Sequence, residues 1–178
     1  MYDLTSIKKR NICIMGLMGS GKSIMGKDLG KYLKLKFYDT DKQIEIEAKK
    51  SINAIFEEDG ETYFRDIEEK ICIELLERKN CVISLGGGSI INTKIRKAII
   101  QNSYSIYLNV KLDNLLNRIK TSHKRPLLNK KLNKREILQN LYYDRKKFYE
   151  KADLIVKNDN DKFITLEKIK SKLKSYAK

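Results

Sequence analysis

The sequence lacks the long apolar runs and the cysteine patterns that mark membrane-spanning, secreted and metal-binding proteins. No apolar run approaches the roughly 20 residues that a membrane-spanning helix requires, and residues 1–10 contain no apolar core like that of a signal peptide. The three cysteines, Cys13, Cys72 and Cys81, are odd in number and have no metal-binding or redox spacing. We therefore expect a cytoplasmic protein without membrane partners, whose cysteines are small buried residues.

Acidic residues are scarce relative to basic ones, and the imbalance is uneven. The formal net charge is +15, and residues 111–178 hold 20 lysines and arginines against 8 aspartates and glutamates. Such a bias is compatible with nucleic-acid binding, with anionic small substrates, or with lysines on solvated helix faces. The lysines between 168 and 178 are spread around a helix rather than gathered in one arginine-rich block, so we expect no nucleic-acid partner.

Strand-like and helix-like segments alternate along the 178 residues, which predicts one α/β domain. The connection between the second and third strands is helical from about Lys42 to Lys79, with a break near Gly60. It is too long for a simple crossover, so we expect a small helical subdomain over about residues 40–79. Short apolar stretches predict the strands of a parallel sheet with right-handed crossovers at 11–15, 36–39, 80–85, 104–108 and 154–156.

Residues 16–23, GLMGSGKS, match the phosphate-binding P-loop pattern G-x-x-x-x-G-K-[ST] without a mismatch. The loop would wrap its backbone N–H groups around a phosphate, and the following helix N-terminus adds partial positive charge. Lys22 would reach the outer phosphates, and the Ser23 hydroxyl is a magnesium ligand in such loops. The alternative is an ordinary glycine-rich turn followed by a lysine. The strand before the loop and the helix after it favour binding of a nucleoside triphosphate.

Asp39 and Asp41 lie at the end of the second expected strand, where parallel α/β sheets build their sites. In an extended chain both side chains would face the same side. One carboxylate could then support magnesium, and the other could orient or take the proton of an acceptor hydroxyl. Spacing alone does not exclude a turn in which these aspartates cap the next helix.

Arg65 and the three glycines Gly86, Gly87 and Gly88 each allow two interpretations. Arg65 lies four residues after one glutamate and three before Glu68, so it is either a surface ion-pair partner or a planar fork for a substrate carboxylate, held by Glu68. The glycines directly follow an apolar strand. They indicate either a ligand close to the backbone or a loop that needs positive φ.

Two further arginines are candidates for anion binding. Arg145 falls in the apolar stripe of a helix expected over about 134–151, so it either reaches out to solvent or points into a cavity that holds an anion. Arg125 lies in the basic and polar segment 121–133, the candidate mobile lid, from which it could swing over the phosphates. His123, the only histidine, is not expected to be catalytic, because phosphoryl transfer depends on positioning more than on a titrating base.

The sequence resembles the shikimate kinase family in a set of motifs that follow the family's order and span nearly the whole chain. The resemblance implies a nucleoside-monophosphate-kinase-like, three-layer P-loop fold with a five-stranded parallel sheet, a substrate-binding helical insertion and a lid. It also implies ATP-dependent phosphorylation of the 3-hydroxyl of shikimate, on the route to chorismate and the aromatic amino acids. The motifs are GLMGSGKS at 16–23, FYDTD at 37–41, IFEEDGETYFRDIE at 55–68, ISLGGG at 83–88, RPLL at 125–128 and DRKKFYEKAD at 144–153.

Carried over by motif, the resemblance implies a role for individual residues. The catalytic residues would be Asp41, as the base, with Lys22 and Arg125. Magnesium would be held by Ser23 and Asp39. Shikimate would be bound by Asp41, Arg65, Arg145 and the glycines Gly86, Gly87 and Gly88. ATP would be bound by Gly19, Ser20, Gly21, Lys22, Ser23, Ile24, Arg118 and Arg125.

The chain departs from the family after its last strand. Residues 157–162 lack the arginine that family members often carry near the adenine, so the nucleotide contacts there are expected to be largely to the backbone.

Two other functions fit parts of the pattern: a kinase for another polyol acid such as gluconate, and a non-enzymatic P-loop module that binds nucleic acid. A small carboxylate acceptor explains Arg65 and Arg145, and an alcohol acceptor explains Asp41. We therefore expect a monomeric kinase whose partners are ATP, Mg²⁺ and shikimate.

Overall fold

The computed structural model describes residues 4–119, 134–159 and 161–175. The expected lid at 121–133, with Arg125 and His123, lies outside the described residues. In the part of the chain that is described, no helix is long and apolar enough to cross a membrane. All three cysteines are free and buried, as the sequence predicted.

Five parallel strands form one sheet in the order β2-β3-β1-β4-β5, which confirms the predicted architecture. The central strand β1 pairs with β3 and β4, so that Cys13 lies opposite Ile83 on one side and Ser105 on the other. Because all strands run the same way, their carboxyl ends meet at one edge, and the P-loop leaves the middle of that edge. The strands are β1 (Asn11–Met15), β2 (Lys36–Asp39), β3 (Cys81–Ser84), β4 (Ser103–Asn109) and β5 (Leu154–Lys157).

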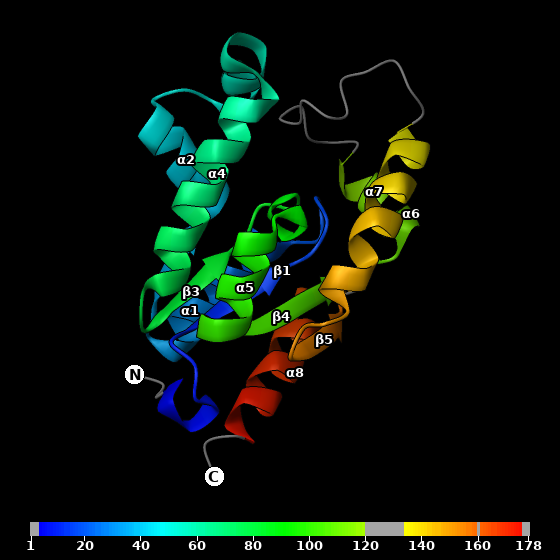
Figure 1. Cartoon of the computed structure of the whole chain (residues 1–178). Coiled ribbons are helices and arrows are strands. Elements are labelled where there is room, and N and C mark those ends of the chain that lie inside the picture. The colour runs from blue at the N-terminus through cyan, green and yellow to red at the C-terminus, as the bar shows by residue number, and fades with distance from the viewer. Residues whose placement is uncertain (1–3, 120–133, 160, 176–178) are drawn as a thin grey trace.

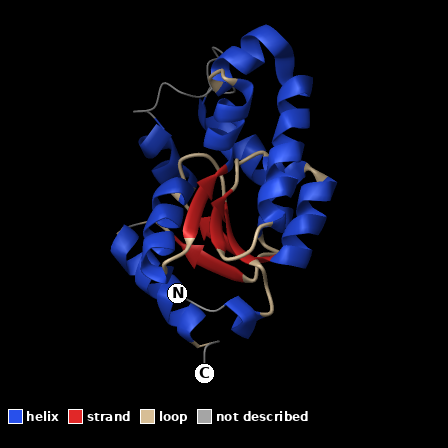
Figure 2. Cartoon of the chain, turned by 90° about the vertical axis from the view of Figure 1, so that its left-hand side faces the viewer, coloured by secondary structure: helices blue, strands red, loops and turns tan. Residues whose placement is uncertain are grey.

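Different helices cover the two faces of the sheet, which lies between them in Figure 2. On the face of β1 that carries Ile12 and Ile14, the core is completed by α1 (Lys22–Leu33) and α8 (Lys162–Lys174). On the face that carries Cys13 and Met15, the core is completed by α4 (Gly60–Glu77), α5, α6 and α7. The four residues of β1 from Ile12 to Met15 are therefore all apolar rather than alternating with polar residues, because both faces are buried. The bounds on this second face are α5 (Thr93–Asn102), α6 (Leu112–Ile119) and α7 (Lys134–Tyr149).

A helical insertion joins β2 to β3 and extends past the sheet in Figure 1. The break expected near Gly60 is present, since Gly60 has a φ of 84°, a conformation that favours glycine. A π-helical turn directly before it was not predicted. The insertion consists of α2 (Thr40–Ala48), α3 (Ile52–Ala54), the π-helical turn (Ile55–Asp59) and α4 (Gly60–Glu77), and two 3-10 turns elsewhere cover Leu4–Ile7 and Ser89–Ile91.

Asn11, at the first position of β1, is a fully buried polar residue at the edge of the sheet opposite the P-loop. Its Nδ2 donates hydrogen bonds to the carbonyl oxygens of Leu76, at 2.8 Å, and Arg78, at 2.9 Å, where α4 ends. Its Oδ1 accepts a hydrogen bond from the hydroxyl of Ser103. One side chain thus satisfies carbonyl groups that the end of a helix leaves without partners.

We expect Asn11→Ala to lower the free energy of unfolding by about 2 kcal/mol or more. The substitution leaves the buried partners of the Asn11 side chain without hydrogen bonds, and each such group costs about 1–3 kcal/mol when unpaired. The exposed Asn140 of α7 provides a matched control, and Asn140→Ala should change stability by less than about 0.5 kcal/mol. Urea denaturation of both variants measures the difference. Equal midpoints for the two variants would contradict the structural role of Asn11.

Candidate active site

The P-loop connects β1 to α1 and takes the backbone shape that an anion site requires. Gly19 and Gly21 have φ values of 77° and 89°, so residues with side chains would be strained there. Gly21 is also the N-cap of α1, and no side chain caps this helix end. The positive end of α1 is therefore directed at the loop, where it favours a phosphate.

A cavity of about 380 Å³ opens beside the P-loop. The Nζ of Lys22, one of its lining residues, donates a hydrogen bond to the carbonyl oxygen of Leu17 at 3.0 Å, so the ammonium lies over the loop. Seven of the expected nucleotide and metal residues line this cavity: Gly19, Gly21, Lys22, Ser23, Ile24, Asp39 and Arg118. The remaining P-loop residue expected to bind ATP, Ser20, is buried, and its hydroxyl has no hydrogen-bond partner.

The loop after β5 is tied to the P-loop through Asn158, whose role the sequence did not reveal. Its buried Nδ2 donates to the carbonyl oxygen of Ser20 at 2.8 Å, and its Oδ1 accepts from Thr165 of α8 at 2.9 Å. Arg118 donates from Nη2 to the Asn158 carbonyl oxygen at 2.8 Å. This loop has no arginine of its own. It lines the cavity through Asn158, and its backbone carbonyl at Asn158 accepts the hydrogen bond from Arg118 of α6.

Asp39 and Asp41 both line this cavity, although the chain between them is not extended as expected. β2 ends at Asp39 and α2 begins at Thr40, because Asp39 caps the helix: its Oδ1 accepts from the backbone N–H of Asp41 at 3.1 Å and of Lys42 at 3.5 Å. The capping alternative is therefore correct for Asp39. It does not remove either carboxylate from the cavity, since Asp41 lies in the first turn of the helix.

A second cavity of about 580 Å³ lies between the helical insertion and α7. Ser23, Asp39 and Asp41 line both cavities, so the two adjoin at these oxygen-bearing residues. Arg65, Arg145 and the three glycines also line the second one. The structure thus brings the expected acceptor residues together from four separate stretches of sequence.

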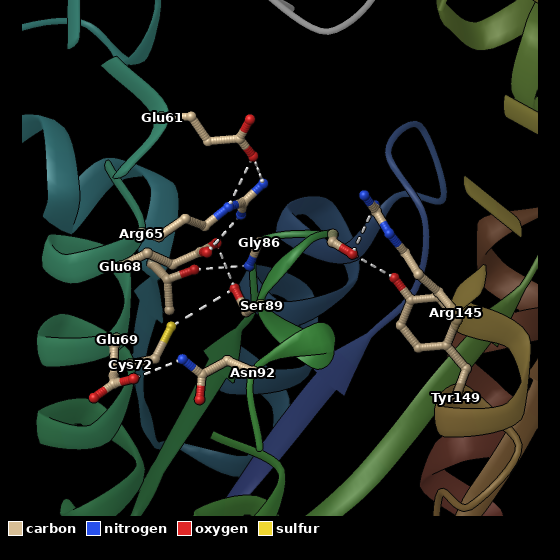
Figure 3. Close-up of polar contacts among 12 residues, drawn as sticks. Glu61, Arg65, Glu68, Glu69, Cys72, Gly86, Ser89, Asn92, Arg145 and Tyr149 are labelled. Atoms are coloured by element: carbon tan, nitrogen blue, oxygen red, sulfur yellow. Dashed lines mark hydrogen bonds and ion pairs between the residues drawn. The ribbon is translucent and has the colours of Figure 1, made fainter. Parts of the chain in front are cut away.

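Arg65 is held by two glutamates of its own helix (Figure 3). Its Nη1 donates to Oε2 of Glu68 at 2.7 Å, and its Nε and Nη2 donate to Oε1 of Glu61 at 3.2 and 3.0 Å. Burial by itself lowers the pKa of the guanidinium, but the charges of Glu68 and Glu61 raise it above its ordinary value, so Arg65 stays charged. Glu68 is buried whereas Glu61 is exposed, so the pair with Glu68 is the better shielded of the two.

Arg145 is only 2% exposed, which favours the cavity over the solvent as the destination of its side chain. Its Nη1 donates to the carbonyl oxygen of Gly87 at 3.0 Å, and its Nε is buried without a hydrogen-bond partner. The hydroxyl of Tyr149 donates to the same carbonyl oxygen at 2.6 Å. Burial raises the pKa of the Tyr149 phenol, so this donor keeps its proton. A guanidinium that lies beside a cavity and has a partner for Nη1 but none for Nε is suited to an anionic ligand.

The three glycines are required by close contacts rather than by positive φ, because none of them adopts it. A Cβ on Gly86 would lie 2.7 Å from Oδ1 of Asp41, and one on Gly88 would lie 2.8 Å from Nη1 of Arg65. On Gly87 it would lie 3.3 Å from the backbone nitrogen of Met18 in the P-loop. Side chains here would push apart the groups that line the two cavities.

The comparisons with known proteins agree on one family. A family model for shikimate kinase matches residues 18–174. The shikimate kinase of Bartonella henselae is 39% identical to this chain over 158 residues, which cover 89% of this chain and 75% of that protein. The structure is also similar to that of the shikimate kinase from Acinetobacter baumannii in complex with shikimate, with a TM-score of 0.89 and 29% identity over 96% of this chain and 97% of the other.

The likeness to the alternative sugar-acid kinases is weaker. A gluconokinase from Sinorhizobium meliloti matches 93% of this chain and 92% of its own with a TM-score of 0.61 and 16% identity, which shows a shared fold alone. The family model for shikimate kinase matches nearly the whole sequence, from inside the P-loop to the end of α8. The chain therefore belongs to the shikimate kinase family, as its motifs predicted.

Proposed function

We propose that this chain performs the family's reaction with ATP in the first cavity and shikimate in the second, and that the γ-phosphoryl group passes to the 3-hydroxyl where the cavities adjoin. The observation that supports this arrangement most directly is the set of residues common to both cavities: Ser23, Asp39 and Asp41. Phosphoryl transfer needs donor and acceptor in line, and a shared boundary provides this geometry.

On the donor side, the P-loop N–H groups and Lys22 bind the phosphates, with Ile24 and Arg118 towards the nucleoside. Gly19, Ser20 and Gly21 contribute through their backbone. The oxygens of Ser23 and Asp39 suit Mg²⁺, which prefers few protein ligands together with water and phosphate oxygens. Asp39 uses Oδ1 to cap α2, so Oδ2 is the oxygen that would face a metal-bound water. When bound, Mg²⁺ neutralises charge on the transferred phosphoryl group.

On the acceptor side, Asp41 orients the 3-hydroxyl and accepts its proton. Arg65 and Arg145 bind the carboxylate of shikimate from opposite sides of the second cavity, and the backbone of Gly86, Gly87 and Gly88 lines it. The buried Nε of Arg145 acquires in this way the acceptor that it otherwise lacks. Arg125, outside the described residues, is proposed to close over the phosphates with the lid.

Both cavities are lined by residues of a single chain, so we propose that the active form is a monomer. The cytoplasmic location expected from the sequence stays a prediction. The helical insertion at about 40–79 is proposed to act as the substrate-binding subdomain, because α2 and α4 supply Asp41 and Arg65.

The acceptor can be identified by measuring ADP release with shikimate, gluconate and nucleoside monophosphates. We expect turnover with shikimate and none above background with the other two, because only shikimate offers both a carboxylate for the two arginines and a correctly placed hydroxyl. Turnover with gluconate and none with shikimate would refute the proposal. A nucleic-acid-binding module would instead show salt-sensitive binding to DNA or RNA and no acceptor-dependent turnover.

We expect Asp41→Asn to lower kcat by about 100-fold or more, since general-base catalysis contributes about 10²- to 10⁴-fold. ATP binding, measured by calorimetry, should be nearly unchanged. The exposed Asp66 on α4 gives a matched control, and Asp66→Asn should keep wild-type kcat. Equal turnover of Asp41→Asn and wild type would refute the role of Asp41 as the base.

We expect Arg145→Lys to raise the KM for shikimate by about 10- to 100-fold, because an ammonium cannot replace the planar fork and a hydrogen bond to a charged group contributes about 1.5–3 kcal/mol. The KM for ATP should stay within twofold. Arg135→Lys, on the exposed part of the same helix, is the control and should alter neither constant. An unchanged KM for shikimate in Arg145→Lys would argue that the carboxylate binds elsewhere.

A further inference from the structure

We propose that Ser89 is a positioning residue of the acceptor site: its hydroxyl fixes the carboxylate of Glu68, which in turn fixes the guanidinium of Arg65. This inference rests on the proposed role of Arg65 in binding the substrate carboxylate. Ser89 lies outside both cavities, so the effect passes through Glu68 rather than through contact with a substrate.

The three side chains form a continuous hydrogen-bonded chain from the interior to the second cavity (Figure 3). Ser89 follows the glycines directly, is fully buried, and donates from Oγ to Oε1 of Glu68 at 2.7 Å. The other oxygen of Glu68, Oε2, accepts from Nη1 of Arg65 at 2.7 Å. Each oxygen of this buried carboxylate thus has one short hydrogen bond, and the two bonds fix the plane of the group.

Cys72, one turn after Glu68 on α4, extends the chain inward. Its thiol lies 3.7 Å from the Ser89 hydroxyl. Burial raises the pKa of this thiol, and the charge of Glu68 raises it further, so the thiol keeps its proton and can donate to Ser89. With Cys72 donating to it, the hydroxyl of Ser89 is directed to use its own proton for Glu68 rather than for another acceptor.

Glu68 needs Ser89 because a buried charge is stable only when its hydrogen-bonding capacity is met. The side chain of Glu68 is 4% exposed, so water does not replace a lost partner easily. Without the serine hydroxyl, Oε1 would lack its donor, and the carboxylate would turn towards other donors. Arg65 would then lose the restraint that holds its Nη1.

The second partner of Arg65 does not provide an equivalent restraint. Glu61 is 58% exposed, and ion pairs at such exposed positions contribute little because water screens them. The backbone reinforces the link to Ser89 instead, since Gly88 lies close against the guanidinium: a Cβ there would come within 2.8 Å of Nη1. The hydrogen bonds from Ser89 to Glu68 and from Arg65 to Glu68 are therefore the link by which Ser89 positions the guanidinium.

Ser89→Ala tests the inference when binding of shikimate and of its methyl ester is measured side by side. We expect the dissociation constant of shikimate to rise about 5- to 10-fold, comparable to the contribution of one ordinary hydrogen bond, because the contact of Arg65 with the carboxylate is loosened rather than removed. The ester lacks the charge that Arg65 recognises, so its dissociation constant should change less than twofold. The kcat with saturating shikimate and the KM for ATP should also stay within twofold. Ser89→Cys retains a weaker donor and should give an intermediate value.

Ser105→Ala is the matched control, because Ser105 is a buried serine that donates to the carboxylate of Asp153 at 2.6 Å in a different part of the sheet. It should lower the melting temperature without changing the preference for shikimate over the ester. Equal losses for shikimate and ester in Ser89→Ala, or no loss at all, would overturn the positioning role.

Arg65→Lys separates this inference from the proposed function on which it rests. A loss of preference for the acid in Arg65→Lys but not in Ser89→Ala overturns the inference alone. An unchanged preference in Arg65→Lys shows that the assignment of the carboxylate to Arg65 is itself wrong, and the inference falls with it.

Discussion

The site depends on three consecutive residues that carry no side chain. Gly86, Gly87 and Gly88 let α2, α4 and the P-loop approach the end of β3 so closely that Asp41, Arg65 and the loop backbone all lie within contact distance of one short segment. The three glycines line the second cavity, and Asp41, against which Gly86 lies, lines both. The segment has ordinary negative φ values, so its glycines are explained by crowding and not by the conformational freedom that usually accounts for glycine.

Charge is kept in the interior around this segment at some expense of stability. Arg145 and Glu68 are both nearly inaccessible to water, and each depends on a few fixed partners. A buried charge with incomplete hydrogen bonding destabilises the folded protein, but it is already desolvated and oriented when an ion of opposite sign arrives. Stability and preorganisation are thus opposed here, which is common at functional sites.

The sequence was sufficient to predict the order of the elements, the P-loop and the stretches that line the two cavities, because these follow from local periodicity and contiguous motifs. Arg145 was also open to prediction, as a charge in an apolar helical stripe. The roles of Ser89 and Asn158 could not be predicted. Their partners, Glu68 and Ser20, lie 21 and 138 positions away in the sequence, and only the folded chain brings them near. The spacing of Asp39 and Asp41 predicts an extended chain between them. In the structure Asp39 caps α2, so the helix already begins at the residue between the two aspartates.

The insertion between β2 and β3 supplies Asp41, Arg65 and Glu68, whereas the P-loop, Arg118 and Asn158 come from other parts of the chain. The acceptor cavity is also lined by the glycines after β3 and by Arg145 of α7, so exchanging one acceptor for another would require changes in three distant stretches. In this architecture selectivity for the acceptor is therefore a property of the folded chain, since no single segment of the sequence contains all the residues around the acceptor.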